Sequence, residues 1–426
     1  LQTGYRRTGE HVYRLLEPQP ERGFALLPPP CPGDLFFDME GDPYFEAGRG
    51  LEYLFGVTSL ENRVPRHRAF WAHTRRDEKL AFEQFIDFVC ERLKRYPDLH
   101  IYHYAHYEPT AIKRLMGEHG TREEEVDDLL RRHVFVDLHR VVRQALRISH
   151  PSYSIKNVRT FFMEQDRSSA GAETVSPPEA GSVGGAIIDA TDCVLAYERW
   201  IDSRDAAELA GIAKYNEVDC LSALKLRDWL VERKAEAEET FGREIQWKAA
   251  PEVHELDEGR IEAVDGLARL KEALLEGVPE EPCGADARGG AGLQSGPRWL
   301  LAQLLDYHRR EDKPDWWAYF ARLEATDEEL LDDLEAITGL EEIPGCPPEP
   351  RKKSLIYTLA FPPQEHKLKP GPVVDPHTQH TYTLVDVDDS VGRLHLLVGP
   401  RDGDKALPRA ARPRDAVCRP SRLHRQ

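Results

Sequence analysis

The chain has 426 residues, of which 31% are charged and 40% hydrophobic, enough for two or three domains of ordinary size. No apolar run reaches the roughly 18 residues that a membrane-spanning helix needs, so the sequence predicts no membrane partner. The seven cysteines are scattered without a Cys-x-x-Cys pair. This spacing argues against a disulfide scaffold and a structural zinc site, and it favours a reducing, cytoplasmic location.

The formal net charge is −18, which at first argues against a protein that binds nucleic acid. The charge is uneven, however, because basic residues outnumber acidic ones from Arg351 onward. An acidic site that holds metal ions can also bind phosphates through those ions. Net charge therefore excludes neither a basic groove nor a metal-dependent phosphate site.

Alternating short strands and helices follow a lead-in segment and a Pro-rich linker. Residues 1–33 end in a Pro-rich run and predict a lead-in followed by a linker. Residues 34–38 predict a buried strand, with strands at 52–60 and 66–71 as its antiparallel neighbours. Apolar residues at helical spacing predict an amphipathic helix over 77–96. Later elements are predicted as strands at 99–102 and 134–136 and helices at 108–116, 123–132, 138–146 and 205–233.

This order of elements predicts an α/β domain built around a mixed sheet over residues 34–235. Residues 164–190 are rich in Ser, Gly, Ala and Pro and predict a flexible excursion inside it. The remaining parts are predicted as a charged helical linker at 236–296, a helical unit at 297–345, a small β-rich segment at 346–400 and a disordered tail at 401–426.

Two carboxylates end the first predicted strand. Asp38 and Glu40 are two residues apart, so a strand places both side chains on the same side. Adjacent carboxylates repel each other unless a cation lies between them, and a divalent ion with oxygen ligands is the simplest relief. A strand that merely ends in an acidic turn is the more common origin of an isolated Asp-x-Glu.

Two further segments carry acids at defined positions. Glu108 begins a predicted helix directly after a buried strand, where the helix dipole favours an anion. A simple capping acid is the alternative. Tyr215 and Asp219 are four residues apart and share one helix face, close to the apolar stripe. A carboxylate there is costly to bury without a partner or a metal, and the tyrosine could orient a water.

These three motifs, in this order within one α/β domain, resemble the DEDD exonucleases of the ribonuclease H-like superfamily that have a Tyr-x-x-x-Asp third motif. The resemblance implies a two-metal 3′–5′ exonuclease, with two Mg²⁺ or Mn²⁺ ions roughly 3.5–4 Å apart. The implied metal ligands are Asp38, Glu40, Glu108 and Asp219. Tyr215 is the implied water-orienting residue. The chain departs from the family at Glu108, where the family usually has the shorter Asp.

Five longer segments are similar to the RecB-family nucleases of bacteria, and the resemblance spans roughly residues 1–400. The segments are 38–43, 102–108, 197–200, 215–220 and 307–314. Those proteins join a PD-(D/E)xK nuclease module, a ribonuclease H-like exonuclease and a superfamily 1 helicase. The resemblance implies that this chain is a fragment of a DNA-processing nuclease–helicase. Residues 1–30 would then end the first module and 297–400 would enter the helicase module. The sequence has no Gly-x-x-x-x-Gly-Lys-Ser/Thr loop, so ATP hydrolysis is not assigned to it.

Accessory roles are predicted for residues near the second and third motifs, each beside a structural alternative. Possible accessory residues of the metal site are His103, His106 and Asp137, with the histidines otherwise structural and Asp137 otherwise a helix N-cap. Residues that could contact nucleic acid by stacking or through phosphates are Tyr104, Tyr107, Lys156, Asn157 and Arg159. For Tyr104 and Tyr107 the alternative is core filling.

Three functions follow for residues 34–235. The first is a metal-dependent exonuclease acting on single-stranded DNA or duplex ends. The second is a non-catalytic module that binds nucleic acid for a helicase, with Glu108 as the sign of a degenerate acidic site. The third is a purely structural interaction domain, which the intact type and order of the three motifs make least attractive.

Overall fold

The computed structural model describes residues 1–46, 49–163, 190–249, 258–278, 292–305, 307, 322–323, 325, 327–331, 333–399 and 407–413. The chain divides into two compact units, Leu1–Ala263 and Val264–Gln426. The excursion predicted at 164–190 lies, except for its last residue, outside the described residues. Within the described part, no helix is both long and apolar enough to cross a membrane.

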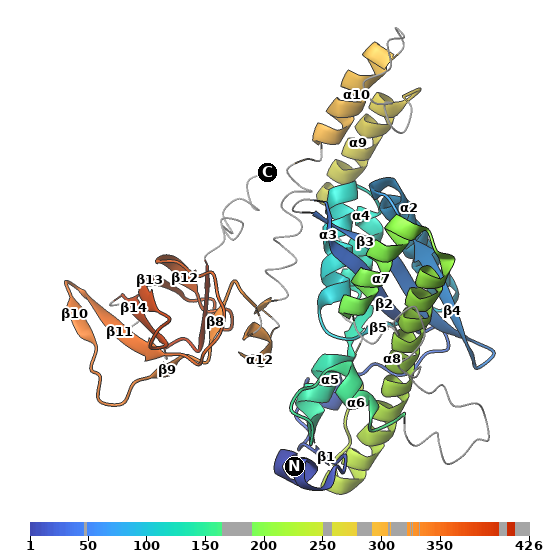
Figure 1. Cartoon of the computed structure of the whole chain (residues 1–426). Helices are drawn as coiled ribbons and strands as arrows, with labels where there is room; N and C mark the ends of the chain where they lie inside the picture. The colour runs from blue at the N-terminus through green and yellow to red at the C-terminus, as the bar shows by residue number, and fades with distance from the viewer. Residues whose placement is uncertain are drawn as a thin grey trace. The chain divides into compact units, whose positions relative to one another are not determined.

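A five-stranded mixed sheet forms the centre of the first unit (Figure 1), in the order β4-β3-β2-β5-β6. The strands are β2 (Leu35–Glu46), β3 (Arg49–Glu61), β4 (Val64–Trp71), β5 (Ile101–His103) and β6 (Phe135–Asp137). The first three strands are antiparallel to one another, whereas β5 and β6 run parallel to β2. The predicted α/β fold with a mixed sheet is therefore confirmed.

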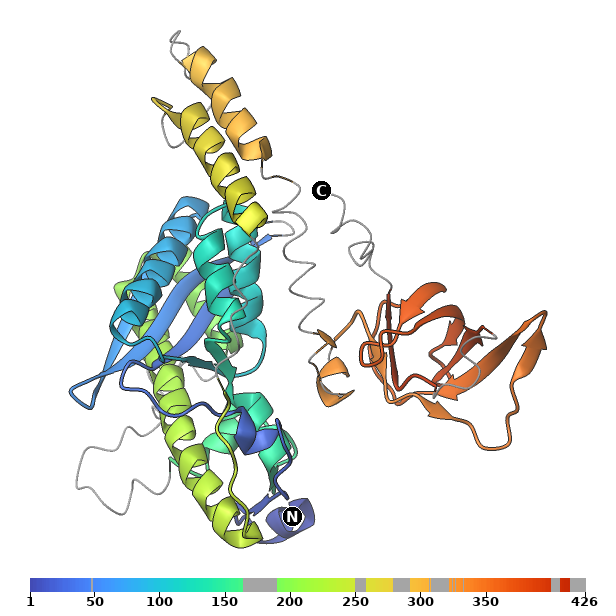
Figure 2. The same cartoon turned by 180° about the vertical axis from the view of Figure 1, so that it is seen from behind.

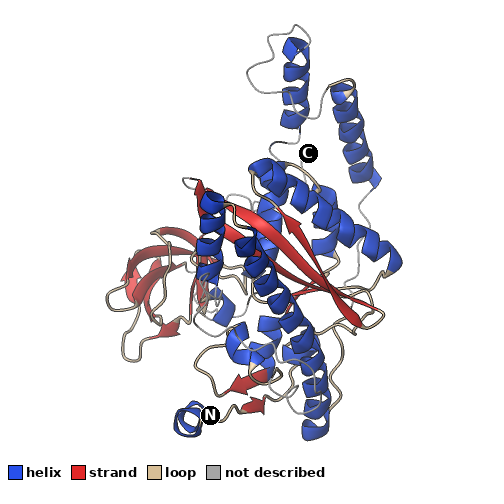
Figure 3. Ribbon diagram, turned by 45° about the vertical axis from the view of Figure 1, so that its right-hand side comes forward, coloured by secondary structure: helices blue, strands red, loops and turns tan. Residues whose placement is uncertain are grey.

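Helices cover both faces of this sheet (Figure 3). The helices of this region are α2 (Arg75–Arg95), α3 (Tyr107–His119), α4 (Glu123–Arg131), α5 (Leu138–Ala145), α6 (Ile155–Arg159), α7 (Ala190–Ser203) and α8 (Ala206–Phe241). Of these, α5 and α6 pack against α8 beyond the edge of the sheet (Figure 1). Strand alternation sends successive side chains of β2 to opposite faces. Phe37 stacks on Phe85 of α2, with ring centroids 4.2 Å apart. Phe36, on the other face, lies under the guanidinium of Arg227 from α8.

The final helix α8 extends eight residues beyond its predicted end. It stops at Gly242, whose positive φ of 59° is a left-handed conformation that glycine adopts without strain. Lys234 pairs with Glu238 one turn later, at 2.6 Å, across the predicted boundary between the domain and the linker. Strong helix formers in this stretch continue the helix although its apolar stripe has thinned.

The packed domain also reaches beyond the predicted limits of 34–235. Strand β1 (Tyr13–Leu15) pairs antiparallel with β7 (Leu146–Ile148). A 3-10 turn, η1 (Gly23–Leu26), and the helix α1 (Gln2–Thr8) accompany it. Phe24 and Leu27 are buried in the core, and the Lys248 amide donates to the Leu27 carbonyl at 2.9 Å. These short pairings depend on partners far away in the sequence, so no local periodicity predicts them.

The second unit contains an eight-stranded antiparallel sheet (Figure 2), in the order β10-β11-β14-β13-β12-β15-β8, with β9 paired to β11. Its strands are β8 (Ile337–Thr338), β9 (Glu341–Glu342), β10 (Glu349–Arg351), β11 (Ser354–Ala360), β12 (Gly371–Val374), β13 (Thr381–Asp388), β14 (Arg393–Val398) and β15 (Ala410–Pro413). The helices α10 (Gly292–Leu305) and α12 (Asp327–Leu330) precede it, and α9 (Glu258–Leu275) spans the division between the units.

Two predictions for this region are corrected. The helical unit predicted at 297–345 ends in the strands β8 and β9, and most of its aromatic residues lie outside the described residues. The tail predicted to be disordered at 401–426 contains strand β15, which pairs with both β12 and β8. Hydrogen-bonding partners from elsewhere in the sheet order this short segment, which has no periodicity of its own.

A histidine at the start of β5 should make the first unit sensitive to acid. Burial, followed by the charge of Lys248, lowers the pKa of His100 to about 4. Between that value and the ordinary pKa near 6.5, the unfolded chain binds a proton that the native state excludes, so stability falls as the pH falls. When the pH falls from 7.5 to 4.5, we expect the free energy of unfolding to fall by about 2 kcal/mol less in His100→Asn than in the wild type. Urea unfolding at both pH values measures this, and equal losses would contradict it.

Candidate functional site

Strand β2 brings two acidic side chains to one face of the sheet. Asp38 lies opposite Gly56 of β3, and Glu40 lies opposite Leu54. Both belong to the same alternating set as Phe36 and therefore point toward α8, away from α2. Glu40 is buried and Asp38 is half-buried. The predicted pairing of the two carboxylates on one side of a strand is thus what the structure contains.

Glu108 joins them from the neighbouring strand. It lies in the first turn of α3, just after β5, which runs parallel to β2. The Glu108 side chain is only 5% exposed. Its Oε2 atom is buried and has no hydrogen-bond partner among the described residues. A buried carboxylate oxygen without a donor is costly unless a cation meets it.

Helix α8, which faces the Asp38 and Glu40 side chains, supplies the third motif. It packs against β2 and β3, and it carries Tyr215, Asn216 and Asp219. The Asn216 amide donates from Nδ2 to Oδ2 of Asp38 at 2.9 Å. Asp219 accepts a charged hydrogen bond from the Arg159 guanidinium of α6. The side chains of Arg159 and Asp219 are 23% and 15% exposed, respectively.

Electrostatic effects among these groups show that they share one site. Burial, followed by the charges of Glu40, Asp219 and Glu108, raises the pKa of Asp38 well above its usual range. Burial and the charge of Asp219 raise the pKa of Glu40 to about 8. Burial also raises the pKa of Tyr215, and the charges of Asp219 and Glu40 raise it further. The five residues predicted from the sequence therefore meet in one cluster, which we call the acidic cluster: Asp38, Glu40, Glu108, Tyr215 and Asp219.

The donor set of the acidic cluster fits hard divalent cations such as Mg²⁺ or Mn²⁺, which prefer carboxylate oxygens. Mutual repulsion among its buried carboxyls and the unpartnered oxygen of Glu108 both favour a bound cation. With the side chains as they stand, the described residues include no three His, Cys, Asp or Glu groups arranged around one ion. In this arrangement Arg159 donates a hydrogen bond to the Asp219 carboxylate, and Asn216 donates one to the Asp38 carboxylate.

The predicted accessory residues take different positions. Asp137 caps α5 by accepting from the His139 amide at 2.8 Å, and its Oδ1 also accepts from the Ala105 amide at 2.9 Å, which is the N-cap alternative. His103 is buried, and its Nδ1 lies 3.6 Å from Oε2 of Glu108. His106 is exposed at the start of α3, where the described residues include no contact between it and the acidic cluster.

His103 lies beside Glu108. Burial alone would lower the pKa of His103, but the neighbouring Glu108 carboxylate and the charge of Asp137 raise the pKa overall. Nδ1 also lies 2.6 Å from the Ala105 carbonyl, which holds the ring in place. We assign His103 as a positioning residue for Glu108.

The residues predicted to contact nucleic acid also separate into groups. The Tyr104 hydroxyl donates to the Tyr153 carbonyl, and its ring packs on the core, as the structural alternative had it. Tyr107 is half exposed, and its hydroxyl donates to Glu52 at 2.8 Å. Asn157 donates to Ser152 near the start of α6, and Lys156 is exposed on the same helix. Arg159, in contrast, contacts Asp219 of the acidic cluster.

Sequence reasoning missed two neighbours of the acidic cluster. Asn216 is fully buried and bridges to Asp38; it lies inside the Tyr-x-x-x-Asp motif, and its adjacency to Tyr215 was the available signal. Cys193 of α7 is buried, and its thiol lies near enough to Glu40 to influence the pKa of that carboxyl. Nothing in the sequence around Cys193 indicated this contact, because it depends on how α7 packs beside β2.

Gly56 should be essential for the cluster. A Cβ atom at this position would lie 1.5 Å from Oδ1 of Asn216, closer than any real contact. Asn216 would have to leave Asp38, so we expect Gly56→Ala to destabilise the first unit by about 3 kcal/mol through overpacking. Thermal unfolding measures this. Gly4→Ala is the control in the same unit, since a Cβ atom added at Gly4 would have no neighbour within 4 Å; equal melting temperatures of the two variants would contradict the prediction.

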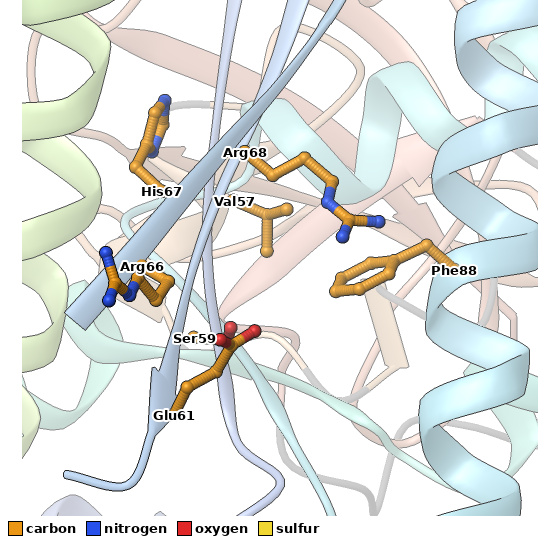
Figure 4. Close-up of a pocket in the computed structure, with 7 residues that line it drawn as sticks. All are labelled: Val57, Ser59, Glu61, Arg66, His67, Arg68 and Phe88. Atoms are coloured by element: carbon orange, nitrogen blue, oxygen red, sulfur yellow. The ribbon is translucent and has the colours of Figure 1, made fainter. Parts of the chain in front are cut away.

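A separate pocket of about 210 Å³ lies between β3, β4 and α2 (Figure 4). Its lining residues are Val57, Ser59, Glu61, Arg66, His67, Arg68 and Phe88. The Arg68 guanidinium lies 4.6 Å from the centroid of the Phe88 ring. Val57 is paired with Phe37, which faces α2, so this pocket opens on the face of the sheet opposite the acidic cluster.

A comparison with protein families finds one match to this region. The RNase_H superfamily model matches residues 35–176 and 183–231, a span that runs from β2 into α8. It includes every member of the acidic cluster. No curated protein and no solved structure matches the chain.

Proposed function

We propose that the RNase H-like domain of this chain is a metal-dependent 3′–5′ exonuclease of the DEDD type with a catalytic tyrosine. The observation that carries the proposal is the convergence of Asp38, Glu40, Glu108 and Asp219, with Tyr215 beside them. Three separate chain segments deliver these groups to one face of the sheet. Burying several acids together destabilises a fold, so their presence here favours a functional role.

The four carboxylates would hold two divalent ions, which would activate a water molecule and stabilise the leaving 3′ oxygen of a phosphodiester. Tyr215 orients the attacking water through its hydroxyl. The raised pKa keeps that phenol protonated, so it acts through hydrogen bonds and not as a charged base. His103 and Asn216 fix the orientations of Glu108 and Asp38.

The substrate we propose is a nucleic-acid 3′ end, with DNA favoured over RNA and single strands or duplex ends favoured as its form. The similarity of segments such as 38–43 and 215–220 to RecB-family nucleases supports DNA and a cytoplasmic enzyme. It also supports a helicase module as a partner of this domain.

A non-catalytic module with a degenerate acidic site is the second candidate, because Glu108 replaces the usual Asp. Two observations favour the enzyme. Glu108 is buried among the other acids rather than turned to solvent, and its Oε2 has no hydrogen-bond partner among the described residues. A carboxylate that had lost its ligand role would be under no constraint to remain ionisable there.

Single-stranded DNA and RNA oligonucleotides labelled at the 3′ or the 5′ end test the proposal. With Mg²⁺ or Mn²⁺, we expect early release of a labelled mononucleotide from the 3′ label and a descending ladder from the 5′ label. With EDTA, neither should appear. No hydrolysis with either metal, under conditions in which the protein binds the oligonucleotide, would favour the binding module.

A further inference from the structure

Arg159 is a cation in direct contact with one of the proposed metal-binding acids. Its guanidinium donates from Nη2 to Oδ1 of Asp219, and its Nε is buried without a hydrogen-bond partner among the described residues. Its side chain stays 23% exposed, so Arg159 reaches solvent although its Nε is buried. Arg159 lies on the short helix α6, whose first turn is capped by Ser154.

Charge balance indicates which incoming group suits Arg159. Four ionised carboxylates and two divalent ions are together neutral. A bound phosphodiester adds one negative charge and its transition state more, so the site needs a further cation. A guanidinium provides several donors in a planar fork that matches phosphate oxygens, and Arg159 has at least one donor that Asp219 does not use.

We infer that Arg159 is a phosphate-binding residue that holds Asp219 in the metal-free protein and turns to a phosphate oxygen of the substrate when metal ions take Asp219. This inference rests on the proposed function. It makes Arg159 responsible for two opposite effects. Arg159 opposes metal binding, because it occupies a ligand and repels cations, and it favours phosphate binding.

The test compares wild type, Arg159→Met, Arg159→Lys and the control Arg147→Met. Arg147 is exposed on β7, and its guanidinium donates to backbone carbonyls away from the cluster. Thermal unfolding across a Mn²⁺ titration measures metal affinity. Calorimetry with thymidine 5′-monophosphate in saturating Mn²⁺ measures phosphate affinity, with no phosphodiester bond to hydrolyse.

For Arg159→Met we expect Mn²⁺ to bind roughly fivefold more tightly and the nucleotide to bind roughly tenfold more weakly. Arg159→Lys should lie between Arg159→Met and wild type, and Arg147→Met should match wild type. A merely structural arginine would weaken both affinities on removal, and that result would overturn the inference. Equal affinities in wild type and Arg159→Met would overturn it while leaving the proposed function standing. Failure of the wild type to bind Mn²⁺ would overturn both.

Discussion

Asp38→Asn is expected to lower metal-dependent hydrolysis by about a thousandfold or more, since a bound metal ion supplies several kcal/mol of transition-state stabilisation. The charges of all three other carboxyls raise the pKa of Asp38, which places Asp38 at the centre of the cluster. An amide there removes one charged ligand while keeping the size of the side chain. Release of 3′-labelled mononucleotide from single-stranded DNA, under single-turnover conditions, measures the loss.

The fold should survive this change. Without metal, Asp38→Asn should melt at or above the wild-type temperature, because the neutral amide removes like-charge repulsion and still offers an oxygen to Asn216. Added Mn²⁺ should then stabilise the wild type more than the variant. Asp87→Asn is the matched control; Asp87 is an exposed acid of α2 paired with Arg122. Wild-type rates for Asp38→Asn would refute the assignment of Asp38 as a metal ligand.

Glu108→Gln is expected to lower hydrolysis by about a hundredfold, whereas Glu108→Asp should retain much more of it. Both variants alter the same buried position, but only Asp keeps a charged ligand. Glu108 faces the other acids, and His103 lies beside its Oε2. The comparison of the two variants therefore separates the role of charge from that of side-chain length.

The same end-labelled assay measures this pair, with nucleotide binding as the second readout. If Glu108→Gln hydrolysed DNA as fast as the wild type, Glu108 would have no ligand role and the second motif would be degenerate. If neither the wild type nor the variants hydrolysed DNA but all bound it equally, the non-catalytic module would be the better description.

The α/β character of the first unit follows from local sequence patterns, whereas the members of the acidic cluster were predicted from three short motifs together with their resemblance to the DEDD exonucleases. Strand alternation alone places Asp38 and Glu40 on one side, and helical spacing places Tyr215 and Asp219 on one face. Such relations hold over two to four residues and need no knowledge of the rest of the chain. The position of Glu108 at a helix start is equally local.

Distant pairing accounts for what the sequence did not reveal. The contacts of β1 with β7 and of β15 with β12 and β8 join segments that carry no periodicity of their own. These pairings set the limits of the first domain and the strand β15 in the tail that is predicted to be disordered. A segment of three or four residues gains its order from a partner's hydrogen bonds, which a local pattern cannot contain.

The same physical reason separates the acids of the site from the residues around them. The acids are recognisable by type and spacing, but Asn216 acts on Asp38 only because α8 packs over Gly56, where a side chain would collide with it. Arg159 meets Asp219 only because α6 packs on α8. Short-range geometry thus pairs Asp38 with Glu40 and Tyr215 with Asp219, whereas long-range packing brings the three segments together and decides which groups hold the acids.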